Sequence, residues 1–221
     1  MFYQWKVTWK KAQTMPANEI DCFLFDLGGV LVHWDGVVPL VDLANGRLTL
    51  DQARRFWLES PWVIRFETGQ CSREVFARGV VDELGLTIHP SAFLEAFRSW
   101  DKGPLPGAAE LLHALKQRWQ VACLSNNNEL HWSSPALRAL ASPFDPCILS
   151  FEVGLMKPDR AIYELAVRRI GRPPHKIVCF DDNPECVEAA KGAGLQAFVA
   201  KGVDGVRARL IQLSIPIGHA H

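Results

Sequence analysis

The sequence predicts an α/β fold, in which a doubly wound, Rossmann-like parallel sheet carries an inserted all-helical cap. One observation behind this prediction is that short apolar runs alternate with helix-like segments, which is typical of parallel strands joined by right-handed crossovers. The other is that about ninety residues, 27–119, separate the first apolar run from the next. A simple loop of that length is uncommon in a compact domain, so a further structural unit is expected there.

Five apolar runs have the length and composition of strands that are buried on both faces of a sheet. We expect these strands at 20–25, 120–124, 147–150, 176–180 and 196–200. The segments between them read as helices, because their apolar residues recur at helical spacing or a capping residue precedes them. The expected helices cover 108–119 after Pro106-Gly107, 159–170, 184–192 with Asn183 as cap and Pro184 in the first turn, and a last helix that Asp204 caps and that ends near 213.

The long interval is predicted to be helical, with helices at 51–58, 72–84 and 91–100. The chain then divides into an N-terminal extension (1–19), a core (20–33 and 103–214) and a cap (34–102). Because the cap directly follows the first strand, it is expected to stand over that strand's carboxyl end, where open α/β sheets bind ligands. The alternative is a second domain without contact with the site. The aromatic residues expected to form the core of the cap are Trp57, Trp62, Phe66, Phe76, Phe93 and Phe97.

Composition limits the partners of the protein. Of 221 residues, 24 are Lys or Arg and 24 are Asp or Glu, so no net field attracts nucleic acid or an anionic membrane. The six cysteines include no CxxC pair, which favours reduced thiols and a cytoplasmic location. We find no apolar stretch of the roughly 20 residues that a membrane helix needs. Residues 1–17 lack the apolar region of a secretory signal, and Met15 is an alternative start to Met1.

Asp26 is the first residue that indicates chemistry. It ends an apolar run and is followed by Leu27-Gly28-Gly29, so its carboxylate is expected at a strand end, free of crowding. A carboxylate there can accept a phosphoryl group and divide one hard hydrolysis into two easier steps. Ser125-Asn126 follows the second strand in the same way, where a hydroxyl and backbone N–H groups can bind a phosphoryl oxygen. An ordinary turn is the alternative for this pair.

Two further segments complete the predicted site. Lys157 stands at the entrance of the helix after the third strand and can neutralise a phosphoryl group and an attacking carboxylate; a solvated lysine is the alternative. Asp181 and Asp182 follow the fourth strand. Adjacent carboxylates repel unless a cation lies between them, and oxygen ligands favour Mg²⁺. The alternative is a helix N-terminus with a spare acid.

These segments resemble the haloacid dehalogenase-like superfamily, and within it the phosphatase branch with a helical cap, of which sugar-1-phosphate phosphatases of the α-D-glucose-1-phosphatase kind are the most similar type. The resemblance rests on residues 23–30, 124–126, 154–158 and 180–185. It implies that the first, second and fourth strands lie side by side. It also implies a small phosphorylated metabolite as substrate and a monomer or small homo-oligomer.

The roles it implies are nucleophile for Asp26, phosphate binding for Gly28, Ser125, Asn126 and Lys157, charge neutralisation for Lys157, and Mg²⁺ binding for Asp26, Gly28, Asp181 and Asp182.

Gly28 departs from the family pattern, because most phosphatases of the superfamily carry a second aspartate there as general acid. General acid–base help contributes roughly 10²- to 10⁴-fold to rate. Four interpretations stay open: a phosphatase for good leaving groups, a 2-haloacid dehalogenase, a non-catalytic or regulatory binder, and another phosphoryl transfer such as a mutase. A further hypothesis is that His33 or Asp35 supplies the proton; the alternative is a hinge with solvated side chains.

Overall fold

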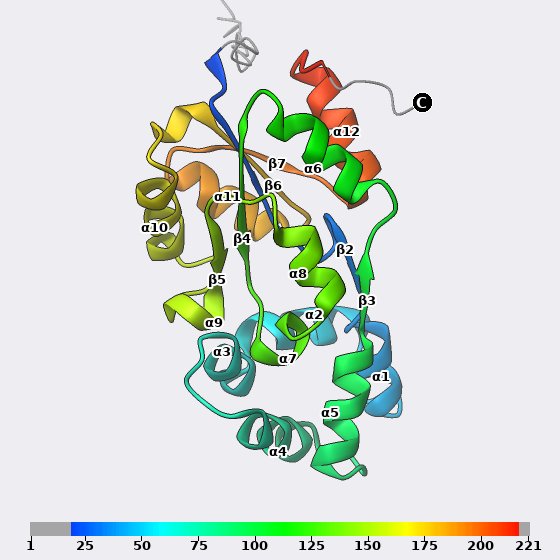
Figure 1. Ribbon diagram of the computed structural model, residues 1–221. Coiled ribbons are helices and arrows are strands. Elements are labelled where there is room, and N and C mark those ends of the chain that lie inside the picture. Colours follow the sequence, from blue (N-terminus) through cyan, green and yellow to red (C-terminus); the bar gives the residue numbers. More distant parts are fainter. Residues whose placement is uncertain (1–18, 217–221) are drawn as a thin grey trace, which may run out of the picture.

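The computed structural model describes residues 19–216. Its centre is a five-stranded parallel sheet in the order β5-β4-β1-β6-β7 (Figure 1). The strands are β1 (Cys22–Phe25), β4 (Gln120–Ser125), β5 (Cys147–Leu149), β6 (Ile177–Asp181) and β7 (Gln196–Val199). The predicted first, second and fourth strands, now β1, β4 and β6, therefore lie side by side. The N-terminal extension up to Asn18, and with it the choice between Met1 and Met15, lies outside the described residues.

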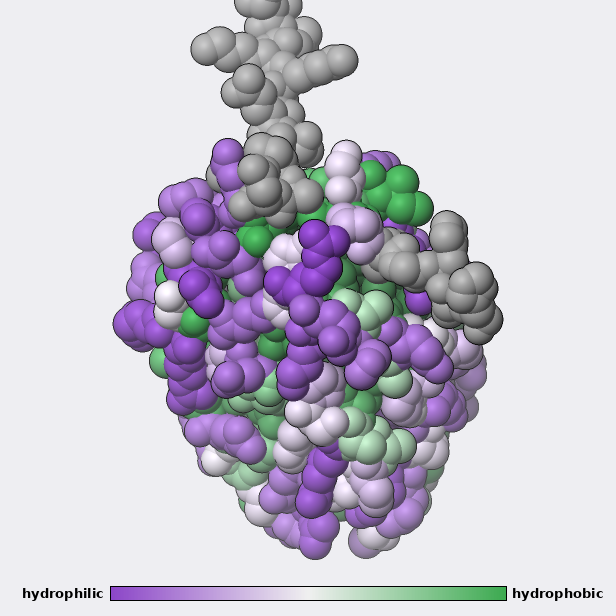
Figure 2. Space-filling view, turned by 45° about the horizontal axis from the view of Figure 1, so that its top comes forward, coloured by the Kyte–Doolittle hydropathy of each residue, from purple (hydrophilic) through white to green (hydrophobic). Residues whose placement is uncertain are grey.

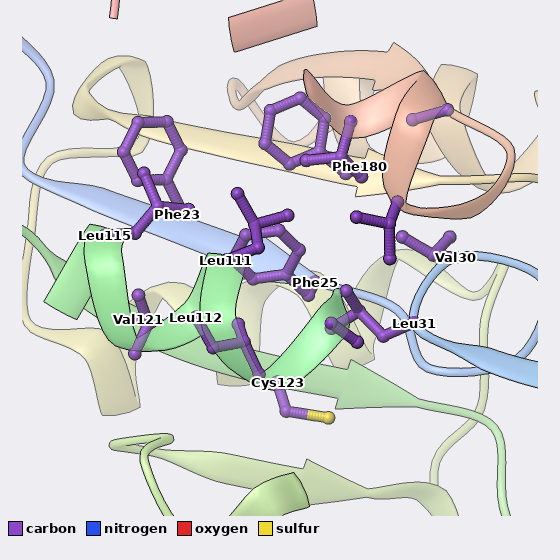
Figure 3. Packing of buried hydrophobic residues seen from close by; sticks show 14 of the residues in the cluster. Phe23, Phe25, Val30, Leu31, Leu111, Leu112, Leu115, Val121, Cys123 and Phe180 are labelled. Atoms are coloured by element: carbon purple, nitrogen blue, oxygen red, sulfur yellow. The ribbon is translucent and has the colours of Figure 1, made fainter. Parts of the chain in front are cut away.

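Helices cover both faces of the sheet. On one face lie α6 (Ala108–Lys116), α8 (Pro135–Ala141) and α12 (Gly202–Gln212), and on the other α10 (Arg160–Ile170) and α11 (Pro184–Gly192). Side chains of β1 alternate between the two layers: Phe23 and Phe25 pack toward α6, whereas Cys22 and Leu24 pack toward α10. Figure 3 shows the first layer, with Leu111 and its neighbours on α6 against the phenylalanines of β1 and β6. The doubly wound prediction is confirmed.

A helical lobe, defined here as α1 to α5, fills the interval after β1. It consists of α1 (Val38–Leu43), α2 (Leu50–Glu59), α3 (Pro61–Glu67), α4 (Arg73–Leu84) and α5 (Pro90–Ser99). Its own apolar core contains Trp57, Phe66, Phe76, Phe93 and Phe97, as expected, and Trp62 packs against it partly buried. An antiparallel ribbon of β2 (Val32–Trp34) and β3 (Asp101–Pro104) joins the lobe to the sheet. The lobe lies against the end of the sheet at which β5 passes into α9 (Ser150–Val153).

Several elements differ from the prediction. The prediction that Asp204 caps the last helix is wrong: α12 begins at Gly202, and Asp204 lies in its first turn. The Gly202 N–H donates to the carbonyl of Gly29 at 2.8 Å, and this bond fixes where the helix starts. The predicted helix at 108–119 already ends at Lys116. The elements without a prediction are β2, β3, α1, α3, α8 and the short α9 and η2 (Pro174–Lys176). The short α7 (Glu129–Trp132) follows β4.

The surface agrees with the balanced charge of the chain. Hydrophilic residues cover most of the face that Figure 2 presents. Large apolar side chains are exposed at few positions in the described part of the chain, namely Val38, Leu50, Val75 and Ile211. No helix between residues 19 and 216 combines the length and the apolar character needed to cross a bilayer.

Candidate active site

The carboxyl ends of three neighbouring strands bring polar side chains to one edge of the sheet. Asp26 directly follows β1, and Ser125 and Asp181 are the last residues of β4 and β6. All three are buried, and all three line the same cavity. The Asp26 N–H donates to the carbonyl oxygen of Phe180 at 2.9 Å, so β6 holds the Asp26 backbone in place. Parallel pairing of β4, β1 and β6 is what collects these residues.

Lys157 connects two of the carboxylates. Its Nζ lies 2.9 Å from Oδ1 of Asp26 and 2.6 Å from Oδ2 of Asp181, and the residue is only 3% exposed. Burial alone would lower the pKa of Lys157, but Asp181 and Asp26 outweigh it and raise this pKa well above its ordinary value. The side chain is therefore a fixed ammonium group between two acids.

The loop that carries Lys157 is held by Asn126. The Asn126 Nδ2 donates to the carbonyl oxygen of Lys157 at 2.9 Å, and the Lys157 N–H donates to the Asn126 Oδ1 at 2.8 Å. The carboxamide of Asn126 is thus engaged in hydrogen bonds within the protein. The backbone is the part of Asn126 that can still face a ligand. The neighbouring Ser125 hydroxyl donates to the Asn126 carbonyl oxygen at 3.2 Å.

Three carboxylates form a cluster of hard oxygen donors. Asp26, Asp181 and Asp182 each offer an oxygen, and these atoms lie within 4.8 Å of one another. Burial raises the pKa of Asp26 to about 7; Lys157 lowers this pKa, and Asp181 and Asp182 raise it. Burial, followed by the charge of Asp181, also raises the pKa of Asp182. One lysine does not balance three acids, so the cluster fits a divalent cation with a preference for oxygen ligands.

Gly29 makes room for one of these carboxylates. Its φ is +72°, a conformation that favours glycine, and a Cβ built there would overlap the carboxylate of Asp182. A glycine is therefore required beside Asp182 both for the turn after β1 and for the approach of the acid. Gly28 has no such restriction, because a Cβ there meets only the Cβ of Trp34 at 3.7 Å.

The cavity above the cluster is large enough for a small metabolite. Its volume is about 680 Å³. The sheet edge supplies the charged wall just described. The opposite wall comes from the ribbon and the helical lobe, whose contributions include Trp34, Arg54, Arg55, Trp57 and Glu67.

The comparisons with known proteins agree with this arrangement. Residues 20–194, well over half of the chain, match the family model of the haloacid dehalogenase-like hydrolases. The chain belongs to the haloacid dehalogenase-like hydrolase family. The resemblance seen in the sequence is thereby confirmed, and the protein is a haloacid dehalogenase-like hydrolase.

Relatives of this haloacid dehalogenase-like hydrolase include a phosphorylated carbohydrates phosphatase of Thermotoga maritima, 33% identical over 93 residues that make up 41% of this chain and 43% of that protein. The chain spans about half or less of the length of most of the curated relatives it matches. A predicted haloacid dehalogenase-like family hydrolase of Porphyromonas gingivalis has a TM-score of 0.71 at 20% identity, over 90% of this chain and 99% of that one. A family enzyme of Bacteroides thetaiotaomicron, solved with magnesium and inorganic phosphate, has a TM-score of 0.65 at 22% identity, over 82% and 94%. At these identities the two structures show the shared fold.

The structure of this haloacid dehalogenase-like hydrolase brings the predicted site residues together. One cavity is lined by Asp26, Gly28, Ser125, Asn126, Lys157, Asp181 and Asp182. The hypothesis that His33 or Asp35 supplies a proton finds no support, since neither lines the cavity and His33 is exposed.

Two further residues of the cavity wall were not among the predicted site residues. Glu67 is the last residue of α3. His131 is buried and also reaches the cavity wall. The His131 Nε2 donates to the carbonyl oxygen of Phe97 in the lobe at 2.8 Å, and its Nδ1 accepts from the Asn128 side chain at 3.3 Å. His131 therefore ties α7 to the helical lobe.

Proposed function

We propose that this hydrolase is a magnesium-dependent phosphatase that hydrolyses a small phosphate monoester, with sugar phosphates as the favoured class. The observation that carries the proposal is the position of Lys157, whose Nζ is within hydrogen-bond distance of both Asp26 and Asp181. Two unit charges at 4 Å interact by about 4 kcal/mol at an effective dielectric constant of 20. An anionic nucleophile that attacks an anionic phosphate needs cations arranged in this way.

In the proposed reaction an oxygen of Asp26 attacks phosphorus in line with the leaving oxygen, and an aspartyl-phosphate forms on Asp26. Water then hydrolyses this intermediate. Lys157 offsets charge on the phosphoryl oxygens, and the Ser125 hydroxyl together with backbone N–H groups at Asn126 and Gly28 orients them. Bound Mg²⁺, held by Asp26, Asp181, Asp182 and the backbone of Gly28, would further neutralise charge at the phosphoryl group.

The relatives support this choice. The Thermotoga maritima relative is by name a phosphatase of phosphorylated carbohydrates, and the Bacteroides thetaiotaomicron enzyme binds magnesium and inorganic phosphate. We further propose that residues 34–102 act as a cap that closes over the substrate and selects it. Free thiols at all six cysteines support a reducing, cytoplasmic location, and the balanced charge supports a metabolite rather than nucleic acid as partner.

A non-catalytic binder is the second candidate, because Gly28 lacks the carboxylate that would serve as general acid. The dehalogenase interpretation is less favoured, since halide displacement has no use for the Asp181-Asp182 pair.

Turnover of p-nitrophenyl phosphate tests the proposal, measured with MgCl₂, with EDTA and with Asp26→Asn as the inactive control. We expect turnover that depends on Mg²⁺ and on Asp26, and then preferences within a panel of sugar phosphates. Wild-type turnover no higher than that of Asp26→Asn would favour the binder. Chloride release from 2-chloropropionate without metal would favour the dehalogenase.

A further inference from the structure

A phosphatase with glycine at position 28 needs another source for the proton of the leaving group. The space beside Gly28 holds no replacement acid, because the nearest atom to a Cβ there is the Cβ of Trp34 at 3.7 Å. The donor must then come from another part of the cavity wall. In an in-line displacement the leaving oxygen departs on the side of phosphorus opposite to Asp26, which is the side of the helical lobe.

Most titratable groups on the cavity wall are unsuitable as proton donors. Asp51 forms an exposed ion pair with Arg54 at 2.6 Å. The Asp101 carboxylate already accepts a backbone N–H at 2.8 Å, and Glu185 is exposed on the first turn of α11. His131 uses both ring nitrogens in hydrogen bonds to protein groups.

Glu67 differs from all of these. It is partly buried, it lines the cavity, and within residues 19–216 its carboxyl group forms neither a hydrogen bond nor an ion pair. The charges that act on it most are those of Lys157 and Asp26, although it bonds to neither. Its carboxyl group therefore shares the cavity with the nucleophile but is separated from it, as a donor on the far side of a transferred phosphoryl group must be.

The end of α3 is fixed against the core. Gly69 has a φ of +70°, and a Cβ built there would lie 2.5 Å from the carbonyl oxygen of Phe151 in α9. The Thr68 hydroxyl donates to the carbonyl oxygen of Ile64 at 2.6 Å and closes the last turn. This docking of the lobe onto the core holds Glu67 over the sheet edge.

We propose that Glu67 is the general acid of the reaction, contributed by the helical lobe in place of the carboxylate that Gly28 lacks. The proposal rests on the proposed phosphatase function. In the first step the Asp26 carboxylate bonds to phosphorus, the bond from phosphorus to the leaving oxygen breaks, and the Glu67 proton passes to that oxygen to release an alcohol. In the second step the Glu67 carboxylate takes a proton from water, whose oxygen bonds to phosphorus as the Asp26–phosphorus bond breaks.

The electrostatics of the cavity agree with this role. Burial raises the pKa of Glu67 to about 8, while Lys157 lowers this pKa and Asp26 raises it. Glu67 therefore holds its proton at neutral pH and can donate it. The other charged groups that the lobe, the ribbon and α7 present to this part of the cavity are Asp51, Arg54, Arg55, Asp101 and His131.

The test compares Glu67→Gln with the wild type on aryl phosphates whose leaving groups become more basic, from p-nitrophenyl to phenyl phosphate. A good leaving group departs without a proton, whereas a poor one needs it. Steady-state turnover of both substrates should fall in Glu67→Gln, because hydrolysis of the aspartyl-phosphate also uses Glu67. The leaving-group effect is read from the first turnover by rapid quench: we expect Glu67→Gln to release the first equivalent of p-nitrophenol within a few-fold of the wild-type rate, and that of phenol roughly 10²- to 10⁴-fold more slowly. The wild-type rate of phenol release in the first turnover should fall above pH 8, and the variant should lack this decline. Glu67→Asp should restore part of the phenyl phosphate activity.

Glu59→Gln is the matched control, because Glu59 is an exposed acid of the same lobe that does not line the cavity. Equal losses of the first-turnover rate on both substrates, or no loss on either, would overturn the role of Glu67 and leave the phosphatase function intact. A wild type without Mg²⁺-dependent turnover of p-nitrophenyl phosphate would overturn both.

Discussion

The carboxamide of Asn126 binds the backbone of Lys157 through two hydrogen bonds, of 2.9 and 2.8 Å, across 31 positions of sequence. The pair joins the end of β4 to the loop before α10. It fixes the peptide whose side chain places an ammonium group between Asp26 and Asp181. The position of the charge thus depends on a neutral side chain.

Asn126→Ala should therefore reduce activity without removing any charge. Loss of two partly buried hydrogen bonds should lower the free energy of unfolding by about 1–3 kcal/mol, and a displaced Lys157 should lower kcat at least tenfold. Urea unfolding and steady-state kinetics measure the two effects. Gln120→Ala is the control, because Gln120 also donates to a distant carbonyl, that of Asp145 at 2.9 Å, but does not line the cavity. Equal kcat values for the two variants would contradict the role of Asn126.

Gly29→Ala should reduce the affinity for Mg²⁺ more strongly than it reduces the stability of the fold. The added methyl group would displace the carboxylate of Asp182, and comparable changes around metal ligands reduce affinity by about 10- to 100-fold. The measurement is the Mg²⁺ concentration at half-maximal activity. Gly46→Ala controls for backbone strain, because Gly46 has a similar φ of +70° with no atom within 4 Å of a Cβ. If both variants required the same Mg²⁺ concentration as the wild type, Gly29 would have no part in the site.

Docking of the lobe onto α7 should weaken in mild acid. Burial lowers the pKa of His131 below its usual 6.5, so the unfolded state takes up a proton at a higher pH than the folded state. The stabilisation is fully present above pH 6.5 and is lost as the pH falls toward the lower pKa of the folded protein. Urea unfolding at pH 7.5 and 5.5 should show a larger loss for the wild type than for His131→Gln. His113→Gln, at an exposed position of α6, should behave like the wild type; identical losses in all three proteins would refute the prediction.

The sheet and its polar edge were predictable because each depends on local pattern. An apolar run that ends in Asp26, Ser125 or Asp181 marks a buried strand and the point where it reaches solvent, and parallel pairing then collects the ends. Asp182 directly follows the end of β6, and Lys157 lies shortly before α10, so both could be predicted from their neighbours in sequence. The predicted cap at Asn183 likewise depends on a contact between near neighbours, because its side chain accepts from the Glu185 N–H.

The opposite wall of the cavity was not predictable in the same way. Whether Glu67 or His131 faces a ligand depends on how the lobe is rotated against the sheet, and this is set by contacts such as that of Gly69 with Phe151. No periodicity within α3 or α7 records that rotation. The wrong prediction for Asp204 has a related cause. Aspartate is typical of helix caps, but Asp204 lies inside the first turn of α12, because the bond between the Gly202 N–H and the distant Gly29 carbonyl sets the start of the helix.

Chemical trapping of the phosphorylated nucleophile tests the central claim most directly. The enzyme is mixed with Mg²⁺ and p-nitrophenyl phosphate, quenched during turnover and treated with borohydride, which reduces an acyl phosphate but not a free carboxylate. Peptide mass spectrometry should then find homoserine in place of aspartate at position 26, and Asp26→Asn should show no such change at any acidic residue. Reduction at another aspartate or glutamate, or none during measurable wild-type turnover, would contradict attack by Asp26.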